Sequence, residues 1–170
     1  MNLYDYIREM PDFPKPGIMF KDITPLLHDP DAFASAVARL SDITKGKAVT
    51  HVVGIESRGF IFGAALALEL GIGFIPIRKP GKLPGETLSE SYSLEYGTDS
   101  VEIHKDALKP GDTVFLVDDL LATGGTMKAA ASLVEKTGAV ISDIAFVIEL
   151  SFLNGRDKLD GYDVTSLLTY

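Results

Sequence analysis

The sequence predicts a single α/β domain in which helices flank a mainly parallel, twisted sheet. Short apolar runs rich in β-branched residues alternate with longer segments of helical periodicity. Two of these runs, 49–55 and 114–117, lead through a glycine-containing turn directly into a helical segment. A length of 170 residues, 46% of them hydrophobic, suits one domain with a sizeable core.

Composition restricts the possible partners and chemistry. The net charge of −8 argues against binding to nucleic acid or to an anionic membrane, because both are held largely by Lys and Arg. The absence of cysteine excludes disulfides, thiolate metal sites and thiol catalysis. The N-terminus has no signal-peptide pattern, and the most apolar stretch, 60–68, is about half a membrane span. We therefore expect a cytoplasmic protein.

The N-terminal region divides into a helix and an arm. Leu3, Tyr6, Ile7 and Met10 have helical spacing, which predicts a short helix over residues 2–10. Residues 12–25 contain three prolines and should be extended. This arm either packs on the core or presents its backbone amide and carbonyl groups to a flat ligand.

A first strand-turn-helix unit follows a scaffold helix predicted over residues 30–44. The buried strand 49–55 runs into Glu56, Ser57 and Arg58, and a helix follows over 60–70. An arginine at such a turn either caps its own loop or grips a diphosphate through its planar guanidinium.

The next strand, 73–77, contains a proline, which favours a position near a sheet edge. Arg78, Lys79 and Lys82 follow it among prolines and glycines. The cluster is either a solvated turn or a diphosphate-binding lip, and its place at the carboxyl end of a strand favours the lip.

Residues 86–104 alternate in polarity on both sides of a Gly-containing turn, which predicts a hairpin. A long segment of this kind inside a compact domain either covers a site or is an ordinary surface hairpin whose glutamate is solvated.

The central unit begins with the apolar strand 114–117 and ends it with Asp118 and Asp119. The turn Thr123–Thr126 then offers two glycines and two hydroxyls before a helix that stops near Gly138. Backbone amides at a helix start bind phosphate well, whereas the two carboxylates suit sugar hydroxyls or a divalent cation. A sugar phosphate fits both halves. Further strands are expected at 144–148 and near the C-terminus, and the three histidines lack metal-ligand spacing.

The run from Val117 to Thr126 resembles the phosphoribosyl pyrophosphate (PRPP) motif of type I phosphoribosyltransferases, in the form found in their adenine-specific members. Residues 54–60 are similar to the pyrophosphate loop of that family, and residues 91–97 to its flexible catalytic loop. The proline-rich arm resembles a segment that helps to form the base pocket. Four segments therefore match in family order, over nearly the whole chain.

The resemblance implies the type I phosphoribosyltransferase fold, with a hood over about residues 1–30 and a flexible hairpin lid over about 80–104. It implies purine salvage: PRPP and adenine give AMP and pyrophosphate, with Mg²⁺ as the cofactor and a homodimer as the assembly. The pyrophosphate loop of this family often contains a non-proline cis peptide, which a sequence cannot show.

The site residues implied by the resemblance form several groups. The catalytic candidates are Arg58, Glu95, Asp118 and Asp119, and Tyr96 is a lid residue. The 5-phosphate and ribose are assigned to Asp118, Asp119, Ala122, Thr123, Gly124, Gly125 and Thr126. Pyrophosphate is assigned to Glu56, Ser57, Arg58, Arg78, Lys79 and Lys82, the family's matching arginine and lysine often acting across the dimer interface. Adenine is assigned to Met19, Phe20, Lys21 and Leu120. Only Asp118 and Asp119 are candidate protein ligands of the metal.

Two alternatives to an adenine-specific enzyme stay open at this point. The first is the same chemistry on xanthine or guanine, because Lys21 stands where we associate an arginine with the family. The other alternative is a non-enzymatic regulatory protein that senses PRPP. Against it stand the lid with Glu95 and Tyr96, the acidic composition and the lack of any DNA-binding extension.

Overall fold

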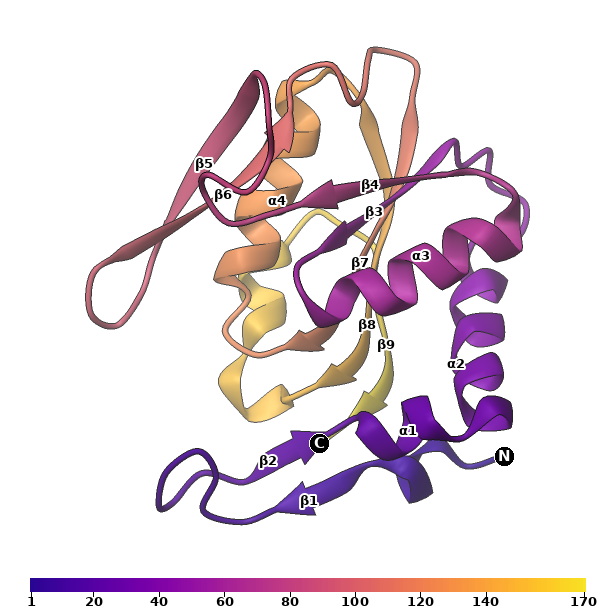
Figure 1. Ribbon diagram of the computed structural model, residues 1–170, viewed down its shortest axis with the longest axis vertical. Helices are drawn as coiled ribbons and strands as arrows, with labels where there is room; N and C mark the ends of the chain where they lie inside the picture. The colour runs from indigo at the N-terminus through magenta and orange to yellow at the C-terminus, as the bar shows by residue number, and fades with distance from the viewer.

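The computed structural model describes residues 1–170, and a five-stranded sheet forms its centre (Figure 1). The strand order is β4-β3-β7-β8-β9, and every neighbouring pair is parallel. The strands are β3 (His51–Ile55), β4 (Gly73–Ile77), β7 (Thr113–Leu121), β8 (Val140–Glu149) and β9 (Val164–Thr169). The predicted parallel sheet is confirmed, and β4 with its proline lies at the edge as expected.

Helices cover both faces of this sheet (Figure 1). On one face lie α2 (Pro30–Ile43), α3 (Arg58–Leu70) and the short α1 (Thr24–His28), and on the other lies α4 (Gly125–Lys136). The 3₁₀ helices are η1 (Leu3–Tyr6), η2 (Ser151–Leu153) and η3 (Gly155–Leu159). No helix combines the length and the apolar character required to cross a bilayer.

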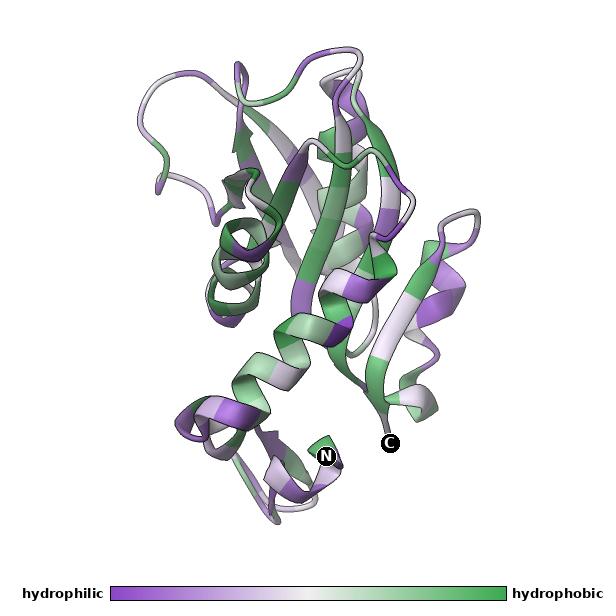
Figure 2. Ribbon diagram, turned by 90° about the vertical axis from the view of Figure 1, so that its right-hand side faces the viewer, coloured by the Kyte–Doolittle hydropathy of each residue, from purple (hydrophilic) through white to green (hydrophobic).

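Two hydrophobic clusters form the core, one on each face of the sheet. Val53 and Leu116 point into the cluster under α4, whereas their neighbours Val52 and Phe115 point into the cluster under α2 and α3. Successive strand residues face opposite sides, so a strand covered on both faces must be apolar throughout. Figure 2 shows this hydrophobic colouring along the central strands.

The N-terminal region differs from the prediction of one helix over residues 2–10. The chain turns once as η1 and then forms strand β1 (Arg8–Met10), which pairs antiparallel with β2 (Phe20–Asp22). Leu3 and Ile7 are both buried, so their helical spacing reflects a shared side of the chain without a continuous helix. The backbone of residues 8–10 instead finds its hydrogen-bond partners in the arm.

The predicted hairpin is confirmed as β5 (Thr87–Ser93) and β6 (Thr98–His104), which pair antiparallel with Tyr92 opposite Asp99. It extends away from the sheet and lies against α4 (Figure 1). Val101 and Ile103 anchor β6 in the core under α4. The tip of the hairpin, residues 94–97, is exposed.

Candidate active site

Asp118 and Asp119 lie in the part of β7 that extends beyond the end of its neighbour β3. β7 pairs with β3 only as far as Val117, whereas its pairing with β8 continues to Leu121. The free edge of Asp118 and Asp119 therefore faces the start of α3. Arg58, the first residue of α3, donates from Nε to Asp119 Oδ2 at 2.5 Å. The side chain of Asp119 is only 10% exposed, whereas that of Arg58 is 48% exposed, so the carboxylate is shielded from water and the guanidinium stays accessible.

Asp118 is held under the first turn of α3. Its Oδ1 accepts a hydrogen bond from the backbone N–H of Asp119 at 2.8 Å. A Cβ added at Gly59 would lie 2.6 Å from the same oxygen, so the helix approaches the strand as closely as only glycine allows. Burial, and then the neighbouring charge of Asp119, raises the pKa of the Asp118 carboxyl well above its ordinary value.

The turn between β7 and α4 forms a small cradle. Gly124 caps the helix in the left-handed conformation at φ 88°, without any capping side chain. A Cβ at Gly124 would lie 2.5 Å from the carbonyl oxygen of Gly155, so the first residue of η3 packs directly against the turn. The amides of the first turn of α4 are therefore free to receive an anion. A cavity of about 90 Å³ here is lined by Asp118, Leu120, Leu121, Ala122, Thr123, Gly124, Gly125, Thr126, Met127 and Phe146.

A second cavity, of about 300 Å³, joins three loops at the carboxyl ends of β3, β4 and β7. Its lining residues are Glu56, Ser57, Arg58, Lys79, Asp118, Asp119, Leu120 and Thr126. All eight are among the site residues that the sequence predicted. The structure thus brings the predicted pyrophosphate loop, one cation of the predicted lip and the predicted PRPP motif to one place.

The carboxylate of Glu56 binds Arg78 and Lys79, the two cationic residues that follow β4. Its Oε1 accepts from the backbone N–H of Lys79 at 2.6 Å and from Nε of Arg78 at 3.2 Å. The guanidinium of Arg78 also lies 5.7 Å from the ring of Phe60. The Glu56–Ser57 peptide is cis, a feature that the family's pyrophosphate loop often has and that the sequence alone could not show. Lys82 is exposed and lines neither this cavity nor the cradle.

A third cavity, of about 440 Å³, lies between the N-terminal strands and α3. It is lined by Arg8, Met10, Phe13, Phe20, Asp22 and Arg58. The rings of Phe13 and Phe20 meet edge to face, with centroids 5.1 Å apart. Arg58 lines this cavity as well as the acidic one, and its guanidinium carbon lies 6.0 Å from the Phe20 ring. The two cavities therefore share a side chain.

The other predicted base-binding residues lie elsewhere. Lys21 points to the opposite side of β2 from Phe20, where Nζ pairs with Glu9 Oε1 at 2.9 Å and stands 3.9 Å above the Tyr170 ring. Met19 is exposed and does not line the Phe20 cavity. Leu120 lines the two cavities at the end of β7.

Glu95 and Tyr96 lie in the exposed tip of the hairpin, and Tyr96 is 88% exposed. Neither residue lines any of the three cavities. The structure therefore does not bring these two predicted residues to the acids.

Sequence reasoning missed most of the wall around Phe20. Arg8 pairs with Asp22 across β1 and β2, and Met10 pairs with Phe20, so all four share one face of that ladder. Residues 8–10 read Arg-Glu-Met, which do not alternate in polarity, so the sequence carried no local signal for this strand. The partners of Lys79 on the hairpin, Tyr92 and Asp99, were also missed.

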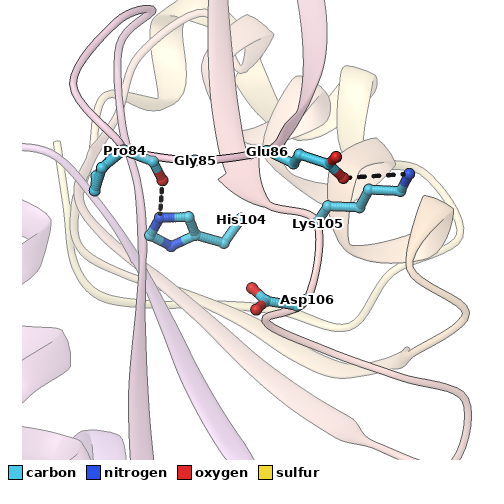
Figure 3. Close-up of a pocket in the computed structure, with 6 residues that line it drawn as sticks. All are labelled: Pro84, Gly85, Glu86, His104, Lys105 and Asp106. Atoms are coloured by element: carbon cyan, nitrogen blue, oxygen red, sulfur yellow. Dashed lines mark hydrogen bonds and ion pairs between the residues drawn. The ribbon is translucent and has the colours of Figure 1, made fainter.

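Another cavity, of about 650 Å³, lies at the base of the hairpin (Figure 3). Two contacts join its polar side chains to neighbours: His104 Nε2 is 2.9 Å from the carbonyl oxygen of Pro84, and Lys105 Nζ is 3.6 Å from Glu86 Oε2. No predicted site residue lines it.

Comparisons with known proteins agree with this geometry. A family model described as "Phosphoribosyl transferase domain" matches residues 26–167. The adenine phosphoribosyltransferase of Kosmotoga olearia is 59% identical over 170 residues, which cover 100% of both chains. The crystal structure of adenine phosphoribosyltransferase from Thermoanaerobacter pseudethanolicus has a TM-score of 0.95 at 56% identity, covering 99% of this chain and 100% of that one. The Saccharomyces cerevisiae enzyme, crystallised with an imino-altritol bisphosphate and adenine, has a TM-score of 0.92 at 44% identity, covering 98% and 96%.

Proposed function

Because this chain belongs to the phosphoribosyl transferase family, we propose that it is an enzyme that transfers the 5-phosphoribosyl group of PRPP to N9 of adenine, with AMP and pyrophosphate as products. The observation that carries the proposal is the single cavity at the ends of β3, β4 and β7, which gathers seven residues of the predicted donor site together with Leu120, a predicted adenine contact. The high identity to adenine phosphoribosyltransferases over the full chain supports adenine as the acceptor.

The 5-phosphate would occupy the cradle at the start of α4. The free first-turn amides, the positive end of the helix dipole and the hydroxyls of Thr123 and Thr126 are the groups that bind a phosphate. The small volume of about 90 Å³ suits one phosphate group rather than a larger anion.

The ribose would then lie over Asp118 and Asp119, whose carboxylates can accept hydrogen bonds from its hydroxyls. Departure of pyrophosphate leaves positive charge on the sugar ring, and these two residues stand beside it. No nucleophilic side chain is required. Asp119 would be held in place by Arg58, and Asp118 by Gly59 and the backbone of its neighbour.

The diphosphate would extend toward Arg58 and Lys79, which line the same cavity. Arg78 and Lys82 stand on the adjoining segment, and we keep them as pyrophosphate-binding candidates from the same or the partner subunit. Adenine would enter the neighbouring cavity against Phe20, because Arg58 connects that cavity with the acids. Leu120, near the end of β7, lines the same cavity as Asp118 and Asp119 and would contact the base next to the sugar.

The hairpin would serve as the lid, with Glu95 handling the purine proton and Tyr96 covering the site. Both residues lie on a short exposed turn between two paired strands, an arrangement that allows the tip to move as one unit. In this proposal residues 80–104 are the lid and residues 1–30 are the hood of a single domain.

Mg²⁺ fits the acidic cavity, where Asp118 and Asp119 supply carboxyl groups. No group of three or more His, Asp or Glu side chains is arranged to hold a metal ion, so most of the ligands would be PRPP oxygens and water. When bound, the ion would offset charge on the leaving pyrophosphate. The proposal also includes a cytoplasmic location and a homodimer.

The alternative of a different purine depended on Lys21. Its ammonium is engaged with Glu9 and Tyr170 outside the Phe20 cavity, which favours adenine with the base read by other groups. The direct experiment mixes the protein with PRPP, Mg²⁺ and one base at a time, and measures both pyrophosphate and nucleotide. AMP should form in equal amount with pyrophosphate from adenine. Preferential turnover of xanthine or guanine, or no turnover of any base, would contradict the proposal.

A further inference from the structure

The ammonium of Lys79 is held by two side chains of the hairpin. Its Nζ lies 2.8 Å from the hydroxyl of Tyr92 and also donates to Asp99 Oδ2. Tyr92 and Asp99 face each other across β5 and β6, with their polar atoms 3.3 Å apart. Asp99 Oδ1 accepts from the backbone N–H of Ser100 at 2.8 Å, which fixes the carboxylate toward Lys79. The three side chains form a closed cluster.

This cluster joins the hairpin to the cavity that would receive pyrophosphate. Lys79 lines that cavity, whereas Asp99 and Tyr92 belong to β6 and β5. The lysine and the aspartate are both partly exposed, at 38% and 34%, so a soluble anion can reach them. The hydrogen bond from Lys79 lowers the pKa of the Asp99 carboxyl below its ordinary value, so the aspartate is charged at neutral pH.

A diphosphate and the Asp99 carboxylate are therefore rival acceptors for one ammonium. An ammonium has three N–H donors, and two are already engaged by Tyr92 and Asp99. The carboxylate also neutralises the charge that would attract pyrophosphate, and two anions on one lysine repel each other. One donor of Lys79 is still available to pyrophosphate, and displacement of Asp99 would give it a second donor and the full charge of the ammonium.

We propose that Asp99 is a positioning residue that holds Lys79 and the hairpin together until the diphosphate of the donor displaces its carboxylate. This inference rests on the proposed function. Donor binding then frees the part of the hairpin that carries Glu95 and Tyr96. The segment set free is short, because Glu102 and Arg78 exchange backbone hydrogen bonds of 3.0 and 2.7 Å. On β5, the Tyr92 ring stays beside Gly125, where an added Cβ would meet it at 3.4 Å.

The test measures the Kd of magnesium pyrophosphate by calorimetry for the wild-type protein and for Asp99→Asn. Asp99→Asn should bind pyrophosphate about threefold to fivefold more tightly, the range of an exposed ion pair. Its Kd for AMP, which has no diphosphate, should not change. Asp106→Asn removes the same charge just beyond the other end of β6 and should leave both values at those of the wild type.

Two further measurements separate displacement from a merely structural role. Hydrogen exchange at the amides of residues 94–99 should rise when pyrophosphate binds the wild type, and should already be high in free Asp99→Asn. Asp99→Glu should restore the wild-type Kd, and Tyr92→Phe should tighten binding to a smaller extent. Weaker or unchanged pyrophosphate binding by folded Asp99→Asn would overturn the inference alone. A wild-type protein that binds no pyrophosphate would overturn the proposed function as well.

Discussion

Arg58 and Asp119 are joined by a hydrogen bond of 2.5 Å between Nε and Oδ2, although they stand 61 positions apart in the sequence. Arg58 begins α3 and Asp119 lies near the end of β7, so the bond ties the helix to the strand at the sheet's carboxyl edge. The same guanidinium lines the Phe20 cavity. One side chain thus connects the acids, the pyrophosphate loop and the cavity proposed for the base.

Replacement of Arg58 by lysine should lower kcat/KM about a hundredfold, the usual loss when one group that stabilises the transition state is removed. A lysine keeps the charge but lacks the planar fork that can reach Asp119 and the diphosphate together. Steady-state assays with varied PRPP measure this. Arg39→Lys on α2, whose guanidinium donates to the Met1 carbonyl, should keep wild-type kinetics. Equal kinetics for both variants would remove Arg58 from the site.

Asp118→Asn should make the protein more stable and less active. Burial and the charge of Asp119 raise the pKa of Asp118, so the folded state disfavours the ionised carboxyl. The contribution of Asp118 to the free energy of unfolding is therefore fully present below the ordinary Asp pKa of about 4. It is lost as the pH rises through the raised pKa of the folded state. At pH 8 the amide should gain about 1 kcal/mol, or ~2–4 °C in melting temperature.

The gain from Asp118→Asn should shrink steadily as melting is measured at lower pH, because protonation of Asp118 then removes the buried charge from the folded wild type. Turnover at pH 8 should fall about a hundredfold. A variant that is less stable than the wild type at pH 8 would show that the ionised carboxylate of Asp118 does not destabilise the folded state.

Gly59→Ala should damage the site by crowding. Its Cβ would lie 2.6 Å from Asp118 Oδ1 and 3.2 Å from Asp118 Cα, and the backbone cannot move away as a flexible side chain would. Overpacking of this kind costs about 1–3 kcal/mol, measured as the free energy of unfolding in urea. Gly73→Ala, which would meet only the side chain of His51 at 3.2 Å, should cost less. Equal stability of the two variants would contradict the close approach of α3 to β7.

The central part of this architecture was readable from the sequence because its signals are local. Apolar strands, a glycine turn and a helical repeat follow one another without interruption around residues 114–137, and they fold as predicted. β7 is nevertheless longer than its apolar run. Asp118 and Asp119 mark the end of hydrophobic burial, whereas hydrogen bonding to β8 continues to Leu121.

What the sequence could not supply depends on tertiary pairing. Residues 8–10 become a strand only because the arm folds back beside them, and the spacing of Leu3 and Ile7 imitates a helix. The partners of Lys79 lie on a hairpin 13 and 20 positions away, and no local pattern indicates which anion a lysine meets. The ion pair of Lys21 with Glu9 likewise depends on the pairing of β1 with β2, which no local pattern indicates.

Substitutions of Phe20 and of Lys21 should have very different effects on the KM for adenine. Phe20→Ala removes the aromatic wall of the cavity and should raise the KM for adenine about tenfold, in line with the strength of base stacking. Lys21→Gln lies on the other face of β2 and should change the KM less than twofold, and should not admit guanine. Competition between adenine and guanine at fixed PRPP measures both effects. A guanine-active Lys21→Gln protein would place Lys21 in base recognition.

Glu95→Gln should lower kcat about a hundredfold while the Kd of PRPP stays within twofold, because loss of a general acid-base group affects chemistry and not donor binding. Its side chain is exposed on the hairpin tip, so the fold should be unaffected. Rapid-quench assays and calorimetry supply the two quantities. Weakened PRPP binding with unchanged kcat would make Glu95 a structural part of the lid.

The central claim is that the ends of β3, β4 and β7 together bind a phosphorylated pentose that carries a diphosphate. The most direct measurement is a calorimetric titration of the wild-type protein with PRPP in the presence of Mg²⁺. The account predicts saturable heat, with one donor bound per chain. A titration that gives no heat beyond dilution, in a protein that is folded by circular dichroism, would contradict it.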